Sequence, residues 1–166
     1  MSKYKSPINL PDEHMRLVGI IAAHWESVNL VLDGFVAFVT MNEIEKVTVL
    51  TKEMSFGNKI NLILAYARQY KATNPEIWKE FTEAIDKVRE ANSHRNDYVH
   101  ATWKVGCADE APQRWVLSLK NGKLKDEVLV VEIDELEKAA QYIYDAGQAL
   151  TDTMSKVGMK SFVLDD

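Results

Sequence analysis

The stretch that decides the fold runs from Asn74 to Trp103 and has the sequence NPEIWKEFTEAIDKVREANSHRNDYVHATW. Asn74 can cap a helix and Pro75 suits its first position, so a helix is predicted from Pro75 to about Trp103. Apolar residues recur every three or four positions through its first half, which indicates a helix with one buried face. They are Ile77, Phe81, Ala84, Ile85, Val88 and Ala91.

The apolar stripe of this predicted helix turns polar before the helix ends. Continued at the same pitch, the stripe reaches Asn92 and Arg95 and then becomes apolar again at Val99. An unpaired guanidinium is costly to bury, so Arg95 must face a carboxylate, a solvent-filled cleft or a partner subunit. His100 lies five residues after Arg95, and at 100° per residue the two side chains can reach one small anion.

Two further long helices are predicted, one on each side of this stretch. Apolar residues at helical spacing run from Pro11 to about Met41. Near the other end of the chain, Asp134 and Glu137 have the spacing of a capping box, which predicts a last helix beginning at Asp134 and ending before Gly158. Both helices have one apolar face, as helices that pack against each other require.

Two shorter helices are predicted between the first long helix and Asn74. One covers residues 42–53, where Asn42 can act as the cap, although Val47-Thr48-Val49 leaves a strand as the alternative. The other runs from Asn58 to about Tyr70, after Ser55-Phe56-Gly57 interrupts the helical pattern.

A β-hairpin is predicted before the last helix, over about residues 113–131. Arg114 to Leu119 and Leu124 to Val131 are apolar or alternate in polarity, and Asn121-Gly122 between them suits a tight turn. The expected fold is therefore mainly α. It is an antiparallel bundle of four to five helices in a single domain over residues 1–166, with this hairpin as a small insertion.

Composition narrows the class of protein. The chain has 166 residues and a net charge of −5, which argues against a broad face for nucleic-acid phosphates. Because the sequence has no apolar run of about 20 residues and no signal-peptide pattern, we expect a cytoplasmic protein that does not enter the membrane. Cys107 is the single cysteine, and the sequence has no HExxH motif or dense acidic cluster, so no metal site and no cofactor are predicted.

The polar residues late in the central helix suit phosphodiester chemistry. Arg95 can hold a phosphate, His100 can move a proton near neutral pH, and Asn96 can orient either group. Asn92 and Lys104 are predicted to bind substrate, because residues 87–104 carry four positive and two negative side chains in an otherwise acidic protein. RNA supplies its own nucleophile, the 2′-hydroxyl, so such a site needs no metal.

The motif Arg95-Asn96-x-x-x-His100, late in a long helix of a helical domain, resembles the Arg-x(4–6)-His motif of the HEPN superfamily. Ser55 to Ile60 and the Trp25-Glu26 pair also resemble some members. The resemblance implies a helical bundle that forms a homodimer, with the two motifs meeting across the interface. It implies a metal-independent endoribonuclease acting on single-stranded RNA, of the kind found in toxin–antitoxin and defence systems, with a cognate antitoxin as a candidate partner.

Under this resemblance Arg95 binds the phosphate, Asn96 orients it and His100 is the acid/base. The alternative that the resemblance implies is an inactive HEPN-like dimer that binds a nucleotide, RNA or a protein partner. A structural role also stays open for each residue. His100 could bond a carbonyl near the helix end, and Arg95 could pair with a buried carboxylate such as Glu26, Asp33 or Glu90.

Overall fold

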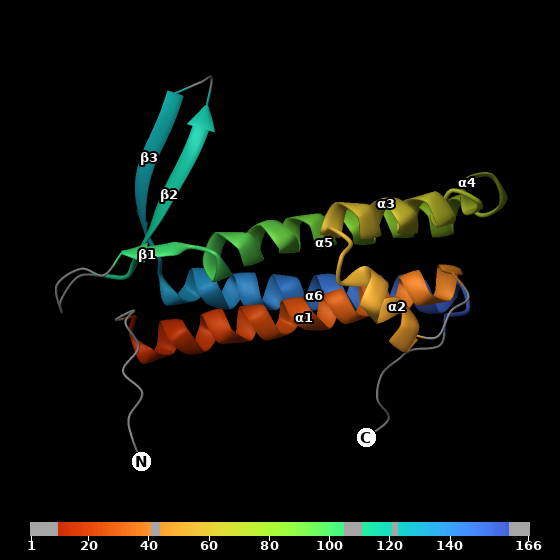
Figure 1. Cartoon of the computed structure of the whole chain (residues 1–166), viewed down its shortest axis with the longest axis horizontal. Helices are drawn as coiled ribbons and strands as arrows, with labels where there is room; N and C mark the ends of the chain where they lie inside the picture. Colours follow the sequence, from red (N-terminus) through yellow and green to blue (C-terminus); the bar gives the residue numbers. More distant parts are fainter. Residues whose placement is uncertain (1–9, 41–43, 105–110, 121–122, 160–166) are drawn as a thin grey trace, which may run out of the picture.

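The computed structural model describes residues 10–40, 44–104, 111–120 and 123–159. Three long helices lie side by side and form the body of the molecule (Figure 1). They are α1 (Asp12–Thr40), α5 (Pro75–Val99) and α6 (Ile133–Lys156). The shorter helices are α2 (Ile44–Thr51), α3 (Phe56–Ala67) and α4 (Tyr70–Thr73), and the strands are β1 (Thr102–Lys104), β2 (Gln113–Lys120) and β3 (Lys123–Val130). This confirms a mainly α fold with a small β insertion before the last helix.

The core of the bundle is made by the apolar stripes of α1, α3, α5 and α6. Its largest fully buried side chains include Phe35, Phe81, Ile21, Ile63 and Ile143. Among the described helices, α1 is long and apolar enough to cross a membrane by length and composition alone, which the sequence analysis did not expect. A core helix passes the same test, and α1 packs against both α6 and α5 here.

Helix α5 ends earlier than the sequence predicted. It stops at Val99, and residues 102–104 form a third strand, β1, instead of the last helical turn. β1 pairs antiparallel with β2, with Thr102 opposite Trp115 and Lys104 opposite Gln113. Pairing with a neighbouring strand satisfies backbone groups that a continued helix would have bonded internally, so a partner distant in sequence sets this boundary.

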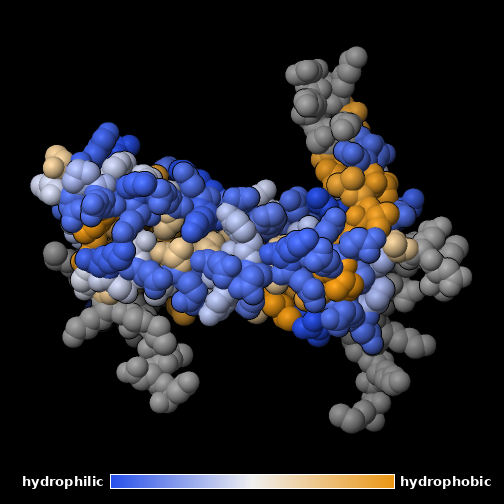
Figure 2. Space-filling view, turned by 180° about the vertical axis from the view of Figure 1, so that it is seen from behind, coloured by the Kyte–Doolittle hydropathy of each residue, from blue (hydrophilic) through white to orange (hydrophobic). Residues whose placement is uncertain are grey.

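The predicted hairpin is present and projects from one end of the bundle (Figure 1). β2 and β3 pair in register from Gln113 opposite Val130 to Lys120 opposite Lys123. The predicted turn at residues 121–122 lies outside the described residues. In the register of the sheet, one face of the ribbon gathers large apolar side chains that remain exposed, and Figure 2 shows this surface along the projection. They are Trp115, Leu117, Leu124, Val128 and Val130.

The helix starts agree with the sequence in some places and not in others. Asn74 caps α5, because its Oδ1 accepts a hydrogen bond from the backbone N–H of Ile77 at 3.3 Å. The predicted cap at Asp134 is wrong: the cap residue of α6 is Glu132, and Asp134 instead pairs with Lys138 at 2.6 Å. The predicted cap at Asn42 lies outside the described residues.

The shorter helices also differ in detail from the prediction. α3 begins at Phe56, before Asn58, because the Ser55 hydroxyl accepts a hydrogen bond from the backbone N–H of Asn58 at 3.2 Å. It ends at Ala67, and the single-turn helix α4 follows. The segment 44–51 is a helix, so the strand alternative is excluded there.

Two glycines should respond to alanine in opposite directions. Gly158 ends α6 with φ of 85°, a left-handed conformation that costs other residues about 1–2 kcal/mol, so Gly158→Ala should lower the free energy of unfolding by about that amount. Gly19 lies in α1, and a Cβ there would meet no atom within 4 Å, so Gly19→Ala should raise stability by about 1 kcal/mol. Urea denaturation measures both; a loss of stability in Gly19→Ala would contradict this account.

Candidate functional site

The three residues predicted to be catalytic form one hydrogen-bonded group at the end of α5. Nη1 of Arg95 donates to Oδ1 of Asn96 at 3.0 Å, and it also makes a hydrogen bond to Nε2 of His100. A guanidinium can only donate, so Nε2 must be the acceptor. The accepting ring nitrogen of His100 therefore lies next to the Arg95 cation.

The end of the helix explains why these side chains meet. Arg95 and Asn96 lie in the last turns of α5, and His100 is the cap residue that follows its last residue, Val99, with φ of −100° and ψ of 8°. This departure from helical geometry at His100 accompanies the turn of the chain into β1. Arg95 is half-buried, whereas Asn96 and His100 are exposed, so the group extends from the bundle interior to solvent.

Arg95 has no carboxylate partner within the part of the chain that the structure describes. Its Nε is buried and makes no hydrogen bond there. The three carboxylates proposed from the sequence have other partners: Asp33 pairs with Lys59, Glu90 accepts from the hydroxyl of Tyr142, and Glu26 accepts from Asn29. The structural ion pair considered for Arg95 is thus not formed by any of these three residues.

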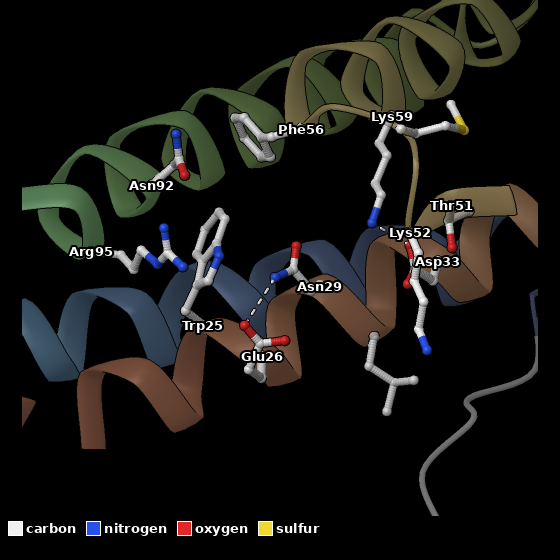
Figure 3. A pocket seen from close by; sticks show the side chains of 12 residues that line it. Trp25, Glu26, Asn29, Asp33, Thr51, Lys52, Phe56, Lys59, Asn92 and Arg95 are labelled. Carbon is white, nitrogen blue, oxygen red and sulfur yellow. Dashed lines mark hydrogen bonds and ion pairs between the residues drawn. The ribbon is translucent and has the colours of Figure 1, made fainter. Parts of the chain in front are cut away.

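Arg95 instead lines a cavity of about 600 Å³ between α1, α5 and the α2–α3 segment (Figure 3). Asn92 lines it beside Arg95, as the sequence predicted for a substrate-binding residue. Trp25 and Phe56 form its middle, with ring centroids 5.5 Å apart. The volume lies in the range of small-ligand sites, which is about 300–1,000 Å³.

The structure does not bring every predicted residue to this cavity. Lys104 is exposed on β1 and is not among the residues that line it. His100 is not a lining residue either, and it is linked to the cavity through its hydrogen bond to Arg95. The cavity and the Arg95–Asn96–His100 group therefore share Arg95 as their common member.

Sequence reasoning missed a buried ion pair in the same cavity. Nζ of Lys59 on α3 lies 2.6 Å from Oδ1 of Asp33 on α1. Both residues interrupt otherwise apolar stripes in their helices, which was the available signal. Their pairing could not be read from the sequence, because it depends on how α1 and α3 pack.

Asp97 also has a role that the sequence did not reveal. Nη1 of Arg114 on β2 donates to Oδ1 of Asp97 at 2.9 Å and to its backbone carbonyl at 3.2 Å. The last carbonyls of a helix lack internal partners, so Arg114 satisfies one of them. The guanidinium also lies 5.4 Å from the centroid of the Tyr98 ring. These contacts tie the hairpin to the segment that carries Arg95 and Asn96.

A second cavity, of about 460 Å³, lies between α5, α6 and the hairpin. His94 lines it and packs on Tyr142 with ring centroids 5.2 Å apart. Burial and the hydrogen bond to Glu90 raise the pKa of Tyr142 to about 12, and burial also raises the pKa of Tyr98. His94 and His100 therefore belong to different sites, which makes His94 a natural control.

Comparisons with protein-family models, with curated proteins and with solved structures find no match. The resemblance to HEPN proteins therefore stays a prediction carried by the residues at the end of α5. In chemical terms, the site offers an imidazole, an amide and a cation that is not neutralised by a described carboxylate. A phosphate is the ligand group that this set suits best.

Proposed function

We propose that this protein is a metal-independent endoribonuclease of the HEPN type that cleaves single-stranded RNA. The observation that supports the proposal is the position of Arg95, which contacts both Asn96 and His100 and lines a cavity without a described carboxylate partner. A cation held in this way is available to a phosphate, and the imidazole next to it can take up a proton.

In the proposed reaction the scissile phosphate displaces His100 from the Arg95 guanidinium. Nε2 of His100 then takes the proton of the ribose 2′-hydroxyl, and the 2′-oxygen attacks phosphorus. The bond to the 5′-oxygen breaks, and this oxygen takes a proton from water or from a protonated His100 of a second copy. Arg95 stabilises the charge that develops on the phosphate, and Asn96 orients it. The products are a 2′,3′-cyclic phosphate and a 5′-hydroxyl.

The test is incubation of the purified protein with single-stranded RNA in EDTA. We expect cleavage to persist without divalent ions and the upstream fragment to carry a 2′,3′-cyclic phosphate, which mass spectrometry identifies. A cognate antitoxin is part of the proposal, so the protein is purified under denaturing conditions and refolded before the assay. No cleavage, or cleavage that stops in EDTA, would exclude the proposed mechanism.

We also propose that the protein acts as a homodimer, as the HEPN resemblance implies, and that it is cytoplasmic and does not enter the membrane, as its sequence led us to expect. Sedimentation equilibrium should then give twice the chain mass of 18.9 kDa, and dilution below the dissociation constant should lower the specific activity. A monomer with full activity at every concentration would contradict a site assembled from two copies.

A second candidate function is a HEPN-like dimer that binds a nucleotide, RNA or a protein partner without cutting. Two observations favour it: the net charge is −5, and Nε2 of His100 is already engaged by Arg95. RNA or nucleotide binding should then survive His100→Ala and fail in Arg95→Ala. Loss of cleavage in both variants, with binding lost only in Arg95→Ala, would instead favour the enzyme.

A further inference from the structure

The end of the 600 Å³ cavity away from Arg95 is formed by the ion pair between Lys59 and Asp33 (Figure 3). The side chains are only 9% and 14% exposed. A buried ion pair is seldom more stable than well-packed apolar residues of the same volume. Its position on the wall of a cavity therefore favours a role in binding over a role in stability.

This ion pair has hydrogen-bonding capacity that its own contact does not use. Within the described ranges, Nζ of Lys59 has Asp33 as its one partner, which leaves two N–H donors. Oδ1 of Asp33 is buried beside Nζ of Lys59, and among the same residues Oδ2 has no partner. The wall thus presents donors beside one open acceptor, and a ligand that matches it must itself carry an acceptor next to donors.

The rest of the cavity suits a ligand with a flat ring and an anionic group. Phe56 and the edge of Trp25, which is 3% exposed, lie between the two ends. Asp33 follows Trp25 by eight residues of α1, a separation of about 12 Å along the helix axis. Arg95 lies at the end near Trp25, so the cation for an anion and the ion pair are at opposite ends of an elongated space (Figure 3).

We infer that the cavity binds a guanine nucleotide unit, with its phosphate at Arg95 and its base at the Lys59–Asp33 pair. One part of this inference rests on the proposed function, namely that the phosphate at Arg95 is the one whose bond is cleaved. The Watson–Crick edge of guanine has the O6 acceptor beside two donors, N1–H and the N2 amine. O6 accepts from Lys59, and both donors share Oδ2 of Asp33 as their acceptor. Adenine and cytosine offer a single donor group on this edge.

The wild-type protein itself tests the inference by calorimetric titration with guanosine, inosine and adenosine 5′-monophosphates and with inorganic phosphate. Inosine lacks only the N2 amine, whose hydrogen bond to a carboxylate is worth about tenfold or more in affinity. We expect guanosine monophosphate to bind about tenfold more tightly than the inosine nucleotide and to exceed phosphate alone. Equal binding of the three nucleotides, or binding no tighter than phosphate, would overturn the inference.

Asp33→Asn sharpens the test because an amide can donate where the carboxylate could only accept. The variant should lose affinity for the guanosine nucleotide and gain affinity for xanthosine monophosphate, whose ring has a carbonyl in place of the N2 amine. Asp134→Asn is the matched control, since Asp134 also pairs with a lysine at 2.6 Å but lies on the surface of α6. A folded Asp33→Asn protein with unchanged preference refutes the inference; if it does not fold, the wild-type titrations decide.

An RNA cleavage assay shows whether the cavity takes a free nucleotide or a nucleotide within an RNA chain. An oligouridine with one guanosine should be cut beside that guanosine, and inosine at the same position should reduce the cut. Binding of guanosine monophosphate without any RNA cleavage supports the cavity assignment and removes the proposed nuclease. Cleavage with no preference for guanosine over inosine overturns the cavity assignment alone.

Discussion

His100→Ala is expected to lower the rate of RNA cleavage by about 10²- to 10⁴-fold, the usual contribution of a general acid or base. The loss follows because no other described side chain at the end of α5 offers a basic nitrogen beside Arg95. Arg95→Ala should cost about 10²- to 10³-fold through lost stabilisation of charge on the phosphate. Single-turnover cleavage of a labelled oligonucleotide in EDTA measures both.

Two control variants on the same helix distinguish loss of a catalytic group from loss of the fold. Arg89 is exposed and pairs with Asp86 at 3.0 Å, and His94 lies in the second cavity. Arg89→Ala and His94→Ala should therefore keep wild-type activity, although each removes the same type of side chain as the test variant. Circular dichroism melts of all four variants show whether the fold is kept. Equal cleavage by wild type and by folded His100→Ala would reject His100 as the acid/base.

Lys59→Met is expected to lower the free energy of unfolding by about 3–5 kcal/mol, because it leaves the Asp33 carboxylate buried without its partner. In a chain of this size such a loss lowers the melting temperature by about 6–20 °C. Replacing both residues, as Lys59→Met with Asp33→Leu, should recover most of the stability, since no uncompensated charge remains. Chemical denaturation of the single and double variants measures the difference.

The surface pair of Lys138 and Asp134 provides the comparison for this experiment. It has the same 2.6 Å separation, but its side chains are 75% and 70% exposed. Solvent screens such a pair, so Lys138→Met should destabilise the protein far less than Lys59→Met does. If Lys59→Met and Lys138→Met destabilise the protein equally, burial is not what governs the energy of the Lys59–Asp33 contact.

The helices and the hairpin could be predicted because their signals are local. Apolar spacing marked the buried faces of α1, α5 and α6, and alternating polarity marked β2 and β3. The end of α5 could not be predicted in this way, because pairing with β2 converts Thr102 to Lys104 into a strand. The start of α6 failed for a related reason: Asp134 matched a capping pattern, but its carboxylate bonds Lys138.

The environment of Arg95 could be predicted from the sequence, because the cost of burying an unpaired charge restricts what this side chain can face. A guanidinium on an apolar stripe had to face a carboxylate, a cleft or a partner, and Arg95 lines a cavity. The partners across the cavity were not predictable. Lys59 and Asp33 come from different helices, and the contact between Asp97 and Arg114 joins α5 to β2. Contacts between different helices and strands depend on how these elements pack, and no local pattern in a single sequence indicates that packing.

The ion pair between Arg114 and Asp97 connects the hairpin to the candidate site. Asp97 directly follows Asn96, so this ion pair joins the ribbon of β2 and β3 to the end of α5 that carries Asn96. The same ribbon carries the exposed apolar face that includes Trp115. A protein bound to that face would therefore be connected to the Arg95 group through the Arg114–Asp97 contact, without entering the cavity.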